Sequence, residues 1–254
     1  MTTFNPNRRF AFAALAAGAA VLALPASSSL AWGTESIKGS GVLKKETRNP
    51  GPFRGVAFAL AGQLEVRIGN TEAVTIEADD NVLRLIETVV ENGTLEIRAA
   101  KRSLNLQNVT IRIVVQARDI DHLSVGGAGT IDAQALRAKA FQANIGGSGS
   151  INLRGIEADS LSTSIGGSGD LKAAGGTVRK ISVSIGGSGS VQLEKVKAVE
   201  AGVNVAGSGD VVLNVTDNLN VSIAGSGGVS YYGDPKVSRT VVGSGGVRRL
   251  GGAR

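Results

Sequence analysis

The hexapeptide GGSGSI occupies residues 146–151 and recurs, with small changes, throughout the second half of the chain. Its other copies are GGAGTI at 126–131, GGSGDL at 166–171, GGSGSV at 186–191, AGSGDV at 206–211, AGSGGV at 224–229 and VGSGGV at 242–247. Successive copies begin 20, 20, 20, 20, 18 and 18 residues apart. A fixed period of this size is typical of a solenoid, in which each repeat forms one coil stacked on its neighbours.

Aliphatic residues recur at fixed places within each repeat. The last residue of the phrase and the residue just before the next phrase are always Ile, Leu or Val, as at Ile151 and Ile165. Polar residues such as Ser162 and Ser164 alternate with apolar ones, and this spacing by twos is typical of β-strands rather than helices. We therefore predict an all-β fold, a right-handed parallel β-helix (β-solenoid) with coils of about 18–20 residues.

Glycine gathers in the phrases, where each coil must turn a corner by positive φ or by close backbone packing. The third phrase position is Ala128 in the first copy and serine in all the others. The serine hydroxyls either satisfy backbone groups of the corner or form an exposed ladder that binds a ligand. The candidate binding surface consists of this ladder and two neighbouring tyrosines, which strand alternation would point in opposite directions: Ser148, Ser168, Ser188, Ser208, Tyr231 and Tyr232.

Residues 1–31 have the pattern of a secretory signal peptide. Arg8 and Arg9 precede an apolar stretch, and small residues before Trp32 predict cleavage after Ala31. A twin-arginine signal and an uncleaved membrane anchor are the alternatives, although the apolar stretch is shorter than the ~20 residues of a membrane span. We therefore expect an exported protein, located in the periplasm or on the outer cell surface, that touches the membrane only through an uncleaved signal segment.

The mature chain divides by its regularity. We expect a flexible lead-in at 32–52, an irregular β region at 53–125 that forms the opening coils and the N-terminal cap, and regular repeats at 126–254; residues 53–250 would then be one continuous domain. Alternating segments include Val82–Val90 and Thr94–Ala99, and Asn92-Gly93 between them predicts a hairpin.

In this order of motifs the chain resembles the head GIN domain family, also called putative auto-transporter adhesins. The resemblance rests on the seven phrases and on four short motifs: GQLEV at 62–66, DNVL at 80–83, ENGTLEI at 91–97 and YGDP at 232–235. It extends over about residues 53–247 and implies a right-handed parallel β-helix in an exported or envelope protein. It implies no catalytic residues.

The sequence contains little that points to catalysis or to a cofactor. It has no cysteine, and its one histidine, His122, is expected to be structural. Each phrase ends in an aliphatic residue, where the calcium-binding nonapeptide needs Asp, so we expect no metal. A polysaccharide lyase or hydrolase remains the alternative, and its candidate residues are Lys172, Arg179, Lys180, Glu194, Lys195 and Lys197.

These patterns favour a non-catalytic, adhesin-like module for binding or structure in the envelope. Its partner would be an envelope polysaccharide or another surface protein. The net charge of +6 comes from scattered residues, which argues against a nucleic-acid site. We expect a monomer whose C-terminal end repels a second copy through Arg248, Arg249 and Arg254.

Overall fold

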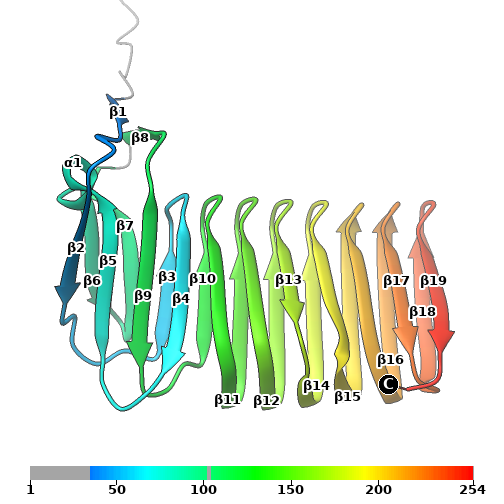
Figure 1. Cartoon of the computed structure of the whole chain (residues 1–254). Helices are drawn as coiled ribbons and strands as arrows, with labels where there is room; N and C mark the ends of the chain where they lie inside the picture. Colours follow the sequence, from blue (N-terminus) through cyan, green and yellow to red (C-terminus); the bar gives the residue numbers. More distant parts are fainter. Residues whose placement is uncertain (1–34, 102–103, 254) are drawn as a thin grey trace, which may run out of the picture. The chain divides into compact units, whose positions relative to one another are not determined.

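Corresponding aliphatic residues of successive repeats lie side by side in the structure, a computed structural model that describes residues 35–101 and 104–253. Ile131 pairs with Ile151, and Ile151 pairs with Leu171 on the next strand. The strands are parallel and stack as a β-solenoid of about six turns (Figure 1). Its strands are β10 (His122–Val125), β11 (Thr130–Ile145), β12 (Ser150–Ile165), β13 (Asp170–Ala173), β14 (Gly176–Ile185), β15 (Ser190–Gly207), β16 (Asp210–Gly225), β17 (Gly228–Tyr232), β18 (Lys236–Val242) and β19 (Gly246–Gly251).

Each regular coil has three paired segments. Strand β11 pairs with β12 over residues 130–133, 135–138 and 140–145, which we call the first, second and third faces. Every face sends apolar side chains into one core, including Ile131, Leu136 and Phe141, each no more than 1% exposed. Because like residues stack on like, the core is a set of continuous aliphatic columns.

The phrases form the corner between the third face of one coil and the first face of the next. A β-carbon on Gly167 would lie 2.3 Å from the carbonyl oxygen of Gly147, and one on Gly169 would lie 2.3 Å from the carbonyl oxygen of Gly149. Within the phrases, a positive φ of 117–142° occurs at the second position of the last three copies, namely at Gly207, Gly225 and Gly243. Close approach between coils is therefore the general reason for glycine here, and positive φ is an addition in the later coils.

The N-terminal half extends the first face with strands of both directions. Strand β4 (Gln63–Ile68) is parallel to β11 and to β9 (Ile111–Ala117). Strand β5 (Ala73–Asp79) is antiparallel to β9, and β2 (Leu43–Arg48) is antiparallel to β5. This change of direction ends the regular parallel stacking in a cap.

The third face is extended in the same way. Strand β10 is parallel to β3 (Gly55–Phe58), and β3 is parallel to β7 (Thr94–Ala99). Strand β6 (Ile86–Glu91) forms a hairpin with β7 through Asn92 and Gly93, with φ of 51° and 77°, so the hairpin predicted from Asn-Gly is confirmed. Strand β1 (Glu35–Lys38) is parallel to β8 (Leu104–Gln107).

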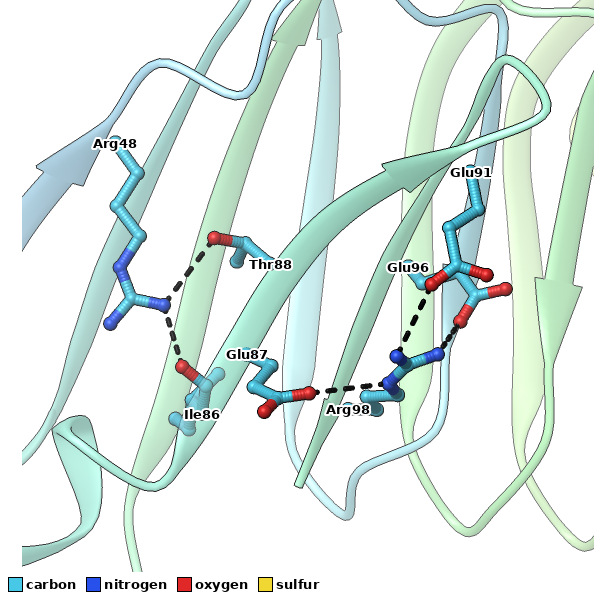
Figure 2. Close-up of polar contacts among 7 residues, drawn as sticks. All are labelled: Arg48, Ile86, Glu87, Thr88, Glu91, Glu96 and Arg98. Atoms are coloured by element: carbon cyan, nitrogen blue, oxygen red, sulfur yellow. Dashed lines mark hydrogen bonds and ion pairs between the residues drawn. The ribbon is translucent and has the colours of Figure 1, made fainter. Parts of the chain in front are cut away.

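Two expectations for the N-terminal half are wrong. The segment 32–52 is not a loose lead-in where it is described, because it contains β1 and the whole of β2. Val82–Val90 is not one strand, because α1 (Asp80–Leu83) forms a short helical turn before β6. Arg48 stabilises this turn by donating a hydrogen bond to the carbonyl oxygen of Leu83 at 3.2 Å. It also donates to the carbonyl oxygen of Ile86 at 2.6 Å (Figure 2).

The outer surface of the β6–β7 hairpin is acidic and carries one central arginine. Figure 2 shows Arg98 among Glu87, Glu91 and Glu96, and it forms an ion pair with each of them. These contacts also raise the pKa of Arg98, chiefly through the hydrogen bond to Glu87. The arrangement ties the two hairpin strands together, and three carboxylates around one guanidinium group leave this cluster with a net negative charge.

Candidate functional site

The serine ladder lies at the exposed corner of the coils. Its backbone N–H groups, not its hydroxyls, join the coils: Ser168 donates to Gly147 at 3.1 Å and Ser188 to Gly167 at 3.0 Å. The structure assigns no hydrogen-bond partner among the described residues to the hydroxyls of Ser148, Ser168, Ser188 and Ser208, all of which are exposed. The interpretation that these hydroxyls satisfy the corner backbone is therefore wrong.

The two tyrosines lie at the C-terminal part of the solenoid. Tyr231 is in register with buried Leu213 and packs against the core, whereas Tyr232 is in register with Asn214. Both rings are half-buried, and the structure does not bring them together with the serine ladder into one pocket.

His122 crosses three strands of the third face at the first coil. Its Nδ1 lies 2.8 Å from Oδ1 of Asp121, and its Nε2 lies 2.8 Å from Oγ1 of Thr94 on β7. The ring reaches Thr94 by lying over Gly55, where a β-carbon would come within 1.8 Å of the ring. Arg54 holds the other carboxylate oxygen of Asp121 at 2.9 Å. The contacts join β10, β3 and β7, which agrees with the structural role expected for this histidine.

An open groove of about 720 Å³ lies on the outside of the first face. It crosses β9, β4, β11, β12 and β13, so residues far apart in the sequence lie next to one another. Its polar and charged lining consists of Gln63, Glu65, Arg112, Asp132, Gln134, Asn152, Arg154 and Lys172. The serine ladder and the tyrosines do not line it. Sequence reasoning missed this site because β9 and β4 precede the repeats and carry no phrase that would align them with β11.

The groove floor is a row of outward side chains in strict register. Glu65 pairs with Asp132, Asp132 with Asn152, and Asn152 with Lys172. Neighbouring strands lie about 4.8 Å apart, so the row offers hydrogen-bonding groups at a regular interval. Such a surface suits an extended chain molecule that lies along the stack of coils.

Both carboxylates of this row are held by neighbouring side chains. Arg67 donates to Glu65 at 2.7 Å, and Asn152 donates to Asp132 at 2.9 Å. The hydrogen bond from Arg67 is the main reason that the pKa of Glu65 is lowered, and the charges of Arg67 and Arg154 act in the same direction. Hydrolysis of a glycosidic bond needs a carboxylic acid with a raised pKa as the proton donor, and Glu65 is the opposite case.

The candidate residues for catalysis do not converge on the groove. Lys172 lines it, whereas Arg179, Lys180, Glu194, Lys195 and Lys197 are absent from its lining. Lys180 is in register with Glu200 on the third face of the next coil. Within residues 35–101 and 104–253, no group of three or more His, Asp or Glu side chains could hold a metal ion.

Residues 1–34, which include the predicted signal peptide and its cleavage site, and Arg254 lie outside the described residues. In the part that the structure describes, no helix is both long and apolar enough to cross a membrane.

Comparisons with known proteins agree with this architecture. A family model described as "Putative auto-transporter adhesin, head GIN domain" matches residues 52–235. No curated protein matches the chain. A structure from Parabacteroides distasonis described as "Putative lipid binding protein" is 25% identical, with a TM-score of 0.71 over 85% of this chain and 100% of the other.

Two further structures share the fold. One from Bacteroides fragilis, described as a putative adhesin, has 20% identity and a TM-score of 0.76 over 84% of this chain and 100% of the other. Another putative adhesin, from Parabacteroides merdae, has 19% identity and a TM-score of 0.63 over 85% of this chain and 99% of the other.

Proposed function

Because this chain belongs to the head GIN domain family of putative auto-transporter adhesins, we propose that it is an exported, non-catalytic module that binds a polysaccharide of the envelope or of a neighbouring surface. The binding site is the groove across β9, β4, β11, β12 and β13. Export follows from the leader pattern of residues 1–31 and is in keeping with the names of the family and of the structural neighbours.

The observation that carries this proposal is the row Glu65, Asp132, Asn152 and Lys172 along the groove. It offers donors and acceptors at strand spacing, which suits repeated hydroxyl groups of a sugar chain. Its carboxylates are already engaged by Arg67 and Asn152, so the row resembles a binding surface more than an acid–base pair.

The test combines binding with turnover. Full-length protein produced in an exporting host is applied to a glycan array, and polysaccharides that bind are assayed for new reducing ends. We expect saturable binding without release of fragments. Release of fragments would replace this proposal by the enzymatic alternative, and the absence of any polysaccharide binding would refute it.

A blocking variant tests the groove itself. Asn152→Trp places a large ring in the middle of the row and should abolish binding. Ser162→Trp is the matched control, because Ser162 is an exposed residue of the same strand on the third face. Far-ultraviolet dichroism verifies that both variants fold. Equal binding by the two variants would exclude the groove as the site.

A further inference from the structure

The charged side chains that line the groove differ in whether a neighbouring side chain binds them. Glu65 is paired with Arg67, Asp132 accepts a hydrogen bond from Asn152, and Arg112 lies 3.6 Å from Glu77. Arg154 and Lys172 differ from these residues, since the described part of the chain provides neither with a hydrogen bond or an ion pair. The lining carries three cationic side chains against the two carboxylates of Glu65 and Asp132, so it is positive on balance. Arg154 acts on Glu65 only through its charge, and its guanidinium N–H groups and the ammonium group of Lys172 stay available to a ligand.

These two cations lie at the same end of the groove. Lys172 on β13 is in register with Asn152 on β12, and Arg154 follows Asn152 by two residues on that strand. Both side chains are exposed. Two like charges on adjacent strands repel each other, and an anion placed between them would relieve this repulsion.

The remaining lining indicates how a sugar chain would be recognised. None of the residues that line the groove is aromatic, so the stacking platform that neutral sugars commonly use is missing. Recognition must then depend on hydrogen bonds and charge. An arginine beside a lysine suits a carboxylate, which can accept two parallel hydrogen bonds from the guanidinium group.

We infer that Arg154 and Lys172 form an anion subsite that selects an acidic polysaccharide with carboxylate groups, such as a polyuronate. The inference rests on the proposed function, because it uses the same groove. The five strands of the groove extend over roughly 20 Å, enough for several sugar units. The carboxylate of the bound polysaccharide lies between Arg154 and Lys172, at one end of the groove. Its sugar hydroxyls contact Asn152, Asp132 and Gln134.

The experiment compares three ligands with one pair of charge-matched variants. The ligands are polygalacturonate, neutral dextran and vesicles of phosphatidylglycerol. Binding of each is measured for the unaltered protein and for two double variants, Arg154→Gln/Lys172→Gln and Arg179→Gln/Lys180→Gln. The last variant loses the same charge outside the groove. We expect polygalacturonate binding to fall by about tenfold or more in the first variant and by less than about twofold in the second, since charge-assisted hydrogen bonds are lost only in the first. The affinity of the unaltered protein should also fall with added salt.

The other outcomes separate this inference from the proposed function. The protein could bind dextran but not polygalacturonate, and Asn152→Trp could abolish the dextran binding. This result would refute the anion subsite and leave the groove as a polysaccharide site. Binding of neither polysaccharide would refute both. If vesicles bind through Arg154 and Lys172 and polygalacturonate does not bind, the anion recognised at this subsite is a lipid headgroup. This result would overturn the inference of a polysaccharide ligand. Equal losses in both double variants would show that net charge alone is responsible.

Discussion

Adjacent glycines in one corner have opposite surroundings. A β-carbon on Gly166 would meet no atom within 4 Å, whereas one on Gly167 would collide with the backbone of the coil before it. The chain itself follows this difference, because the first phrase position becomes Ala206, Ala224 and Val242 in later coils while the second stays glycine. The sequence was sufficient to predict a glycine corner. It did not distinguish close approach from positive φ, because both demand the same residue.

Exchanging each of these glycines for alanine should give clearly different stabilities. Gly167→Ala places a methyl group 2.3 Å from the carbonyl oxygen of Gly147, and separating the coils should cost about 3 kcal/mol of unfolding free energy. Gly166→Ala is the matched control and should stay within about 0.5 kcal/mol of the unaltered protein. Urea unfolding followed by dichroism measures both. Equal stability of the two variants would contradict the close-approach explanation.

At the scale of elements, tertiary stacking outweighs local propensity. Residues 135–141 read as the only run of good helix formers in the repeats, yet they lie within β11 because Ala135, Leu136 and Phe141 each pair with a residue of β12. The reverse occurs at residues 82–83, which apolar alternation places at the start of a strand and which the structure places in α1. There Arg48 donates to the carbonyl oxygens of Leu83 and Ile86, and no periodicity reveals these contacts.

Asp79 anchors the N-terminal cap. It is 2% exposed, its Oδ1 accepts from the N–H of Gly41 at 2.6 Å, and its Oδ2 accepts from the N–H of Thr110 at 2.8 Å. These hydrogen bonds, that of Thr110 first, lower its pKa below the ordinary value of 3.8. A lowered folded-state pKa stabilises the fold above the unfolded-state value, and this stabilisation is lost as the pH falls through the folded-state pKa.

Asp79→Asn should therefore destabilise the cap most at neutral pH. The amide can accept at one oxygen only, so one of the two backbone N–H groups loses its partner. We expect the difference in urea midpoint between the variant and the unaltered protein to be largest near pH 7 and to shrink towards about pH 3. Asp159→Asn, at an exposed aspartate on β12, should show little difference at any pH. A gap for Asp79→Asn that stays constant with pH would contradict the role of the ionised carboxylate.

At the scale of the solenoid, the repeats predicted the stacking but not the groove. The phrase fixes which residues of β11, β12 and β13 lie side by side, and this much follows from the period alone. The groove also needs β4 and β9, whose register with β11 is set by the antiparallel cap. Long-range pairing of irregular strands leaves no period in the sequence, so the repeats alone point to the serine ladder and not to the groove.

The C-terminal end of the solenoid shows how charge is placed over an open core. Among the described residues, no strand pairs with the outer edge of β18 or β19. Arg239 is in register with buried Val221, so it occupies a core column at the point where the column ends. Val237 and Val241 on either side are each 37% exposed. Such an edge would pair with another chain unless charge prevented it, and an inward-placed charge is an effective block.

Arg239 is therefore a stronger candidate for this block than the arginines after the last phrase. Arg249 is occupied by the carbonyl oxygen of Gly233 at 2.7 Å and by Asp234 at 3.3 Å, while Arg248 is in register with Ser230 on the outer side.

Arg239→Val would make an apolar row with Val237 and Val241, and we expect it to convert a monomer into an end-to-end dimer, as measured by sedimentation velocity. Arg248→Ser is the control and should remain monomeric, because it removes a charge of the same edge without extending the core. If Arg239→Val also stays monomeric at the same concentration, the charge in the core column is not what protects this end; if the unaltered protein is already a dimer, the edge is an interface rather than a blocked end.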